Sequence, residues 1–305
     1  MTILATSPLR ADYDAAHGQC IALAPGVQRV TANNPGVMTF QGTNSYIVGD
    51  ASVCIIDPGP DDDAHFEALQ RALAGRHVSH IIISHTHRDH CGLANRLKQA
   101  TGALLVAEGA HRLSRSLHDG EEAAFGESSD WDFSPDITLV DGQQLCGDGW
   151  TLETVLTPGH AANHAAFALK DTGLLFSADH IMAWATTVIA PPDGSMRDYM
   201  ASLDKLLLRS DTVYLPGHGG PVMEPAAYVS GLKTHRIMRE KAILNRIQAG
   251  DQTIDAMVAA MYRGIDLKLH KAACFSVLAH VEDLVQRGAV NAQGPALLHS
   301  TFTPA

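Results

Sequence analysis

The amino-acid sequence predicts an α/β fold in which two β-sheets pack together, followed by a small helical domain. Hydrophobic strands alternate with amphipathic helices early in the chain, the order typical of α/β proteins. Short strands separated by turn sequences follow between residues 137 and 177, which predicts a second, antiparallel sheet. Beyond residue 250 the pattern becomes two helices and a short strand pair, typical of a winged helix. We expect domains at residues 1–225 and 226–305, without a flexible linker.

Length and composition restrict the class of protein. A chain of 305 residues can hold one large domain, or a large domain with a small one. The sequence has no apolar run of about 18 residues, so we expect no membrane partner. Its first 24 residues lack the basic and then apolar segments of a signal peptide. Five cysteines, an odd number without C-x-x-C spacing, indicate reduced thiols in a cytoplasmic protein.

Charge argues against nucleic acid as a general partner. The net charge of −11 at pH 7 produces an acidic surface, which repels polyanions. The tail from Asp251 to Ala305 carries four basic and five acidic residues, whereas a DNA-recognition helix normally has a clear excess of Lys and Arg. We therefore expect no DNA binding. The tail is interpreted as a packing or homodimerisation module that covers one side of a cleft.

The N-terminal half is expected to alternate strands and helices. The segment Asp62–Ala74 has apolar residues at helical spacing, and Gly75 would end that helix. A second helix is expected at Gly92–Thr101. The strands are expected at Val27–Val30, Ser45–Val48, Ser52–Asp57, Ile81–Ile83 and Ala103–Ala107.

The second half is expected to build the other sheet and then the tail. Its strands are placed at Ile137–Val140, Thr151–Leu156, Ala165–Leu169, Gly173–Ser177 and Val213–Leu215. Helices are placed at Met196–Ser210, Tyr228–Gln248, Thr253–Tyr262 and Ala272–Arg287, with wing segments at 288–294 and 296–300. An acidic stretch, Leu117–Ser134, interrupts the succession. It is either a solvated surface insertion or a lid over the cleft.

The most informative stretch runs from Ile81 through Gly92. Its three branched apolar residues suit a strand buried on both faces. That strand leads directly into four candidate metal ligands, His85, His87, Asp89 and His90. Imidazole and carboxylate groups crowded at a strand end suit a borderline cation such as zinc. Further ligands must then come from elsewhere in the chain.

Three later strand ends supply those ligands. The sequence Thr157-Pro-Gly-His160 follows a strand, and its glycine allows a tight turn. The sequence Ser177-Ala-Asp179 ends another strand, and Leu215-Pro-Gly-His218 repeats the Pro-Gly-His order. The candidate metal ligands are therefore His85, His87, Asp89, His90, His160, Asp179 and His218.

This ordered set resembles the metallo-β-lactamase superfamily over about residues 27–220. Within it, the chain resembles the β-lactamase-like protein 2 group, which has a C-terminal winged-helix-like segment. The sequences that carry this closer resemblance are Gln41-Gly-Thr-Asn-Ser-Tyr46, Tyr214-Leu-Pro-Gly-His-Gly-Gly-Pro221, His235-Arg236 and Arg239-Glu240. The chain departs from the group at Ala178, where the family often has glycine, and in its acidic insertion.

The resemblance implies an αββα sandwich with a two-metal cleft along one edge. We expect two Zn²⁺ per chain, with iron or manganese as alternatives. The first metal would be held by His85, His87 and His160. The second would be held by Asp89, His90 and His218, with Asp179 bridging the two. The resemblance also implies that Asp57 orients a ligand histidine.

The implied chemistry is hydrolysis. Two divalent cations about 3.5–4 Å apart can share a hydroxide, and Asp89 would be the catalytic residue that orients it. We predict a hydrolase that uses a hydroxide bridging two zinc ions to cleave an ester, thioester or lactone-like bond of a small molecule. One alternative is an endonuclease of single-stranded RNA, favoured by the resemblance and disfavoured by net charge. The other is a sulfur dioxygenase with one iron.

Several neighbouring residues are given structural roles. His164 is expected to support the site without binding metal, and His180 to point to the opposite face of its strand. Arg88 is either an ion-pair partner or an anion-binding group, and Cys91 is a small buried residue. Surface or helical positions are expected for His65, His77, His80, His111 and His118.

Overall fold

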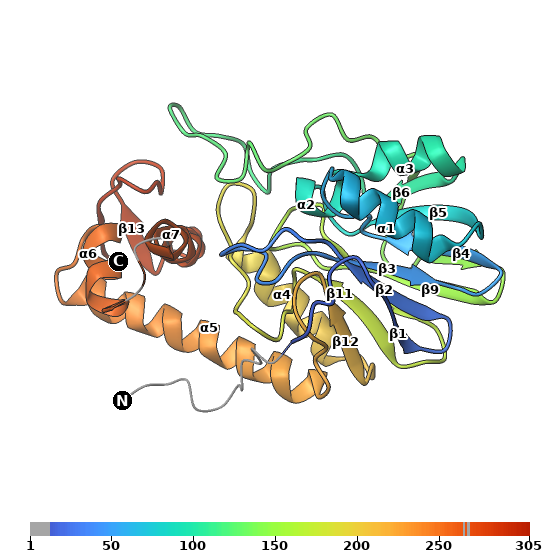
Figure 1. Cartoon of the computed structure of the whole chain (residues 1–305). Coiled ribbons are helices and arrows are strands. Elements are labelled where there is room, and N and C mark those ends of the chain that lie inside the picture. The colour runs from blue at the N-terminus through green and yellow to red at the C-terminus, as the bar shows by residue number, and fades with distance from the viewer. Residues whose placement is uncertain (1–12, 265, 267–268) are drawn as a thin grey trace.

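A computed structural model describes residues 13–264, 266 and 269–305 (Figure 1). Its first sheet has seven strands in sequential order, antiparallel from β1 to β4 and parallel from β4 to β7. These strands are β1 (Cys20–Ala24), β2 (Val27–Thr31), β3 (Asn44–Val48), β4 (Ser52–Ile56), β5 (His77–Ile83), β6 (Leu104–Ala107) and β7 (Ile137–Thr138).

The second sheet has five strands in the order β12-β11-β10-β9-β8, and only the β11–β12 pair is parallel. Its strands are β8 (Gln144–Gly147), β9 (Trp150–Leu156), β10 (Ala165–Leu169), β11 (Leu174–Ala178) and β12 (Val213–Pro216). The expectation of two packed sheets is thus met. Two edge strands, β1 and β8, were not expected, because exposed and buried residues barely alternate in β1 and a turn sequence ends β8.

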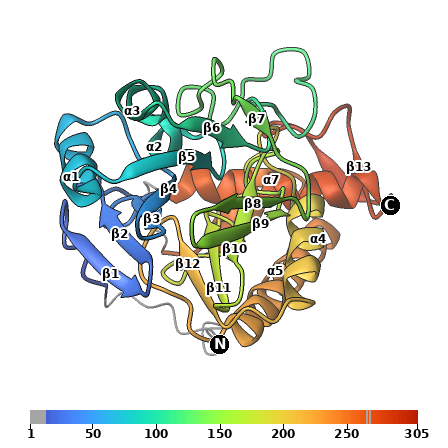
Figure 2. The ribbon, with the colours of Figure 1, turned by 90° about the vertical axis from the view of Figure 1, so that its right-hand side faces the viewer.

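Helices cover the outer face of each sheet, so the layers run helix, sheet, sheet, helix (Figure 2). The first sheet packs against α1 (Asp63–Leu73) and α3 (Ala94–Thr101), with the single-turn α2 (Arg88–Cys91) beside them. The second sheet packs against α4 (Met196–Leu207) and the first half of α5 (Pro225–Gln248). Between the sheets lies a core that includes Tyr46, Trp150 and Phe167. This is the αββα sandwich that the resemblance implied.

The C-terminal part has its own core. It contains the end of α5, then α6 (Ile254–Met261), α7 (His270–Gln286) and the antiparallel pair β13 (Val290–Ala292) and β14 (Phe302–Pro304). The 24-residue α5 runs from the second sheet into this core, so one continuous helix joins the two parts (Figure 1). None of the described helices has the length and hydropathy needed to cross a bilayer. The division at residue 225 remains a prediction.

Several expected elements differ in their bounds; strand β5, for example, begins at His77 and not at Ile81. The helix expected at 92–101 is two helices, since α2 ends at Cys91 and α3 begins at Ala94. Helix α5 begins at Pro225, three residues earlier than expected, because proline suits the first helical position. The second wing strand is β14, beyond the 296–300 segment expected for it.

Packing between the sheets can be tested at Phe167, which is fully buried on β10. We expect Phe167→Ala to lower the free energy of unfolding by about 3–5 kcal/mol, because the removed ring leaves a cavity. Urea denaturation followed by circular dichroism measures this loss. Leu208→Ala is the control, since Leu208 is 89% exposed and its truncation should change stability by less than about 0.5 kcal/mol. Equal effects of the two substitutions would contradict the assigned core.

Candidate metal centre

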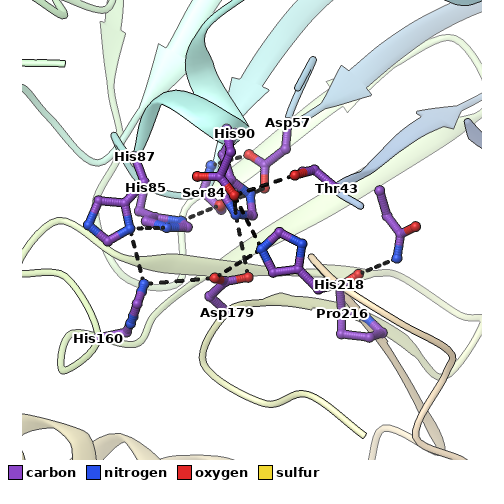
Figure 3. A network of polar contacts seen from close by, with 12 residues as sticks. Thr43, Asp57, Ser84, His85, His87, His90, His160, Asp179, Pro216 and His218 are labelled. Carbon is purple, nitrogen blue, oxygen red and sulfur yellow. Dashed lines mark hydrogen bonds and ion pairs between the residues drawn. The ribbon is translucent and has the colours of Figure 1, made fainter. Parts of the chain in front are cut away.

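All seven predicted ligands lie together at one edge of the sandwich, and Figure 3 labels each of them except Asp89. His85 and His87 follow β5, and Asp89 and His90 lie on α2. The other three side chains follow strands of the second sheet and are His160 after β9, Asp179 after β11 and His218 after β12. The cluster therefore joins strand ends of both sheets and includes residues as far apart in the sequence as His85 and His218, which are separated by 133 positions.

The first group consists of three buried histidines, His85, His87 and His160. The Nδ1 atom of His87 lies 3.0 Å from Nε2 of His85 and 3.1 Å from Nε2 of His160. Nitrogens bound to one tetrahedral zinc at about 2.0–2.1 Å lie about 3.3–3.4 Å apart. The three ring nitrogens therefore converge at close to the separations that a shared metal requires.

The second group consists of Asp89, His90 and His218. Oδ2 of Asp89 lies 3.4 Å from Nε2 of His90 and 3.3 Å from Nε2 of His218. Asp179 lies between the two groups, with Oδ1 3.4 Å from Nε2 of His90 and Oδ2 3.3 Å from Nε2 of His218. Its Oδ2 is also 3.8 Å from Nε2 of His160. Asp179 is thus placed where a shared ligand of two metals would lie.

Two polar atoms of this cluster favour a cation between its members. Nε2 of His90 and Oδ1 of Asp179 are buried and form no hydrogen bond within the described chain. The two atoms lie 3.4 Å from each other, and a buried polar group that lacks a hydrogen bond costs free energy. A cation would satisfy both atoms, so the donor set fits a pair of metal ions.

The other nitrogen of each ligand ring is held by a hydrogen-bond partner. Nδ1 of His160 donates to the Val188 carbonyl at 2.8 Å, and Nδ1 of His218 donates to the Gly42 carbonyl at 3.2 Å. Donation from one ring nitrogen leaves the lone pair of the other facing the cluster. Four of the five histidines present Nε2 in this way, and only His87 presents Nδ1.

Asp57 lies where the resemblance implied, directly behind His90. Its Oδ2 is 2.9 Å from Nδ1 of His90 and also accepts a hydrogen bond from the Ser84 hydroxyl at 2.6 Å. Its Oδ1 accepts a hydrogen bond from the Ser84 backbone N–H at 2.7 Å. The backbone of Asp57 has φ of 51°, a conformation that is unusual outside glycine. This strain is maintained by the hydrogen bonds that orient His90.

Asp193 was not predicted from the sequence. It is 1% exposed, and its Oδ2 accepts a hydrogen bond from Nε2 of His87 at 2.9 Å. That bond explains why His87 alone presents Nδ1 to the cluster. Asp193 follows the Pro191-Pro192 pair, and no ligand spacing or strand end marks it.

Close approach explains the glycines of both Pro-Gly-His sequences. A Cβ on Gly159 would lie 2.5 Å from the Tyr199 Cα, and one on Gly217 would lie 2.5 Å from Oδ1 of Asp179. Ala178, where the family often has glycine, has φ of 43° and is buried. It therefore adopts a left-handed conformation that glycine would adopt at no steric cost.

Charge differs between the two groups. Burial lowers the pKa of His160 to about 4 and that of His85 well below its ordinary value, so these two rings of the first group are neutral. Burial also lowers the pKa of His218, but the charge of Asp179 and hydrogen bonds to both aspartates raise it to about 9. Neutral imidazoles and ionised carboxylates are the forms that bind metal. The carboxylates attract positive charge, in the form of protons or metal ions.

A cleft of about 570 Å³ opens over the cluster. The acidic insertion contributes Phe125 and Ser128 to its wall, and the C-terminal part contributes Tyr262 and Leu269. The insertion is held in place by Asp130, whose N–H donates to the Thr86 carbonyl at 2.9 Å. Of the two predicted alternatives, the presence of Phe125 and Ser128 in the cleft wall favours the lid. The tail covers one side of the cleft, as expected.

The remaining expectations have mixed outcomes. His164 is buried beside His85, forms a hydrogen bond with Thr157 and belongs to neither ligand group. His180 packs against Tyr199 on the outer face of the second sheet. Arg88 pairs with Asp130 of the insertion at 3.7 Å. The surface position expected for His111 is wrong, because His111 is buried between Thr86 and Trp131.

This two-sheet sandwich with histidine and aspartate ligands at one edge defines a class of metal-dependent proteins. Residues 38–218 match the metallo-beta-lactamase superfamily, and residues 253–295 match the beta-lactamase associated winged helix domain. The chain belongs to the metallo-β-lactamase superfamily of hydrolases and carries that winged helix domain at its C-terminal end.

Individual relatives are similar over most of the chain. A beta-lactamase-like protein 2 homolog of Drosophila melanogaster is 30% identical over 291 residues, 88% of this chain and 93% of the relative. An atrochrysone carboxyl ACP thioesterase of Aspergillus fumigatus is 29% identical and spans 74% of this chain and 66% of the relative. A beta-lactamase domain protein of Burkholderia ambifaria shares the fold, with a TM-score of 0.80 at 22% identity over 97% of this chain and 96% of that one.

The role of Asp193 can be tested by Asp193→Asn, which keeps the shape of the side chain and removes its charge. We expect the affinity for Zn²⁺ to fall about 10- to 100-fold, because the ring of His87 loses the partner that fixes its tautomer. Competition with a chromogenic chelator measures this affinity. Asp132→Asn is the matched control, since Asp132 is exposed. If the Asp193 variant bound Zn²⁺ with the wild-type affinity, Asp193 would not be needed to orient His87.

Proposed function

We propose that this chain is a two-metal hydrolase that cleaves a thioester or ester bond in a small molecule, with Zn²⁺ as its metal. The observation that carries the proposal is the grouping of the seven ligands. A three-histidine group and a carboxylate-containing group share Asp179 on the floor of one cleft. A site for one metal would need only the first of these groups.

The residues that would hold the metals follow from the two groups. His85, His87 and His160 would hold one ion, Asp89, His90 and His218 the other, and Asp179 would contact both. When bound, two divalent cations supply an activated water and stabilise negative charge that develops on the substrate. The outer hydrogen bonds that the rings donate to Asp57, Asp193 and the Val188 carbonyl keep the ligand rings in the required orientation.

Asp89 is proposed as the catalytic residue. Its side chain is 28% exposed, compared with 9% for Asp179, and it lines the cleft. Oδ2 faces His90 and His218, which leaves Oδ1 to accept a proton from the attacking water. A carboxylate placed beside a reacting water can serve as its general base.

The walls of the cleft favour a small, partly apolar substrate. They include Val37, Met38, Phe125, Met182 and Trp184. The basic residues in the lining are Arg88 and Arg236, and Arg88 is paired with Asp130. A groove for single-stranded RNA requires a positively charged track along the backbone. The lining therefore supports a small molecule over RNA.

Two further considerations support a thioester. The fungal relative is described as an acyl carrier protein thioesterase, and it aligns with 74% of this chain. A thioester has an acyl carbon that water can attack and a thiol that leaves without a strong acid. The second ligand group also argues against a dioxygenase with a single iron. Cytoplasmic location and homodimerisation remain predictions.

The proposal is tested by Asp89→Ala assayed on a panel of acyl thioesters, lactones and single-stranded RNA. We expect the wild type to hydrolyse thioesters and the variant to lose roughly 10²- to 10⁴-fold in kcat, because the proton acceptor is gone. Circular dichroism should show an unchanged fold. Asp132→Asn again serves as the control. Near-normal turnover by the Asp89 variant, or cleavage of RNA in place of thioesters, would contradict the proposal.

A further inference from the structure

Arg236 is a buried arginine in the wall of the cleft. It lies on α5 and is 3% exposed. Among the described residues its side chain makes one hydrogen bond, which Nη2 donates to the Thr187 carbonyl. Its Nε atom is buried without a partner. An arginine carries five N–H donors, so most of its donor capacity is unused.

No carboxylate of the described residues compensates the charge of Arg236. None lies within ion-pair distance, and the guanidinium carbon lies 5.1 Å from the centroid of the Tyr199 ring. His280 packs nearby, and burial together with the charge of Arg236 lowers its pKa well below the ordinary value. A buried charge without a counter-charge is costly. The position is therefore suited to an anion that comes from outside the chain.

Arg236 is connected to the metal centre by a short series of contacts. It holds the carbonyl of Thr187, and the hydroxyl of Thr187 donates to the Asp179 carbonyl at 2.7 Å. The next residue, Val188, accepts the hydrogen bond from His160. Arg236, Asp179 and His160 line the same cavity. An anion at Arg236 would therefore lie in the same cleft as a bond positioned for hydrolysis.

We propose that Arg236 is a specificity residue that binds a carboxylate on the acyl part of the substrate. This inference rests on the proposed thioester or ester hydrolysis and names its substrate class, acyl esters that carry a second, anionic end. The guanidinium group binds a carboxylate through two parallel hydrogen bonds. A carboxylate is favoured over a phosphate dianion because Arg236 supplies a single positive charge, and Arg88 is already engaged by the insertion.

The test compares two thioesters of N-acetylcysteamine that differ only in charge, succinyl and butyryl. We expect the wild type to favour the succinyl substrate by at least about tenfold in kcat/KM. In Arg236→Gln that preference should fall by roughly 10- to 100-fold, and Arg236→Lys should keep part of it. The matched control is Arg239→Gln, about one turn further along α5, because the Arg239 side chain does not itself line the cleft and packs on the ring of Tyr262. It should keep the wild-type preference.

The opposite results would overturn the inference. Equal wild-type rates for the two substrates, or an unchanged preference in Arg236→Gln, would show that Arg236 does not bind the acyl group. If circular dichroism shows that Arg236→Gln is unfolded, the same comparison is made with Arg236→Lys. Lysine keeps the positive charge but cannot form the two parallel hydrogen bonds of a guanidinium group. A preference for a phosphate-bearing acyl group over the succinyl group would overturn the assignment to a carboxylate.

Binding without turnover separates this inference from the proposed function. Titration calorimetry of the metal-loaded protein with succinate should show affinity that falls at least about tenfold in Arg236→Gln and is unchanged in Arg239→Gln. If the wild type hydrolyses neither thioester but succinate binding depends on Arg236, the function is wrong and the anion site stands. If succinate binds equally to all variants, the anion site is wrong whatever the hydrolytic activity.

Discussion

The structure depends on holding five imidazole rings and two carboxylates within a few ångströms of one another. Such a cluster is unfavourable by itself, because burial removes water from every polar group and the two carboxylates repel each other. The fold offsets this cost by anchoring the far side of each ring, as Asp57 does for His90 and Asp193 for His87. Rigid anchoring keeps the inward-facing atoms available for cations.

The two sheets make this crowding geometrically feasible. The candidate ligands follow the ends of β5, β9, β11 and β12. At Gly159 the backbone approaches Tyr199, and at Gly217 it approaches Asp179, more closely than a residue with a Cβ atom would allow. The cleft above them is completed by distant parts of the chain. Arg115 binds Glu121 of the insertion at 2.6 and 2.7 Å and also Glu282 of α7, so the insertion and the C-terminal domain are joined beside the site.

The clustering of the seven candidate ligands could be predicted from the sequence because each follows a hydrophobic strand within a few residues, with Asp89 and His90 on the single turn α2. The two-sheet order and most helices followed from the same periodicity. Asp193 and Arg236 could not be predicted in this way. Asp193 follows a proline pair with no strand before it, and Arg236 is one of several basic residues on a long helix. Their roles arise from three-dimensional contacts with His87 and Thr187, which no local spacing encodes.

The proposed hydrolysis requires that the two overlapping ligand groups hold two metals. Metal content of the purified protein, measured by inductively coupled plasma mass spectrometry together with thioester turnover, tests it most directly. We expect two zinc ions per chain, loss of turnover when chelation removes them, and recovery only as the second equivalent is restored. One iron per chain, with oxygen consumption in place of hydrolysis, would contradict the account.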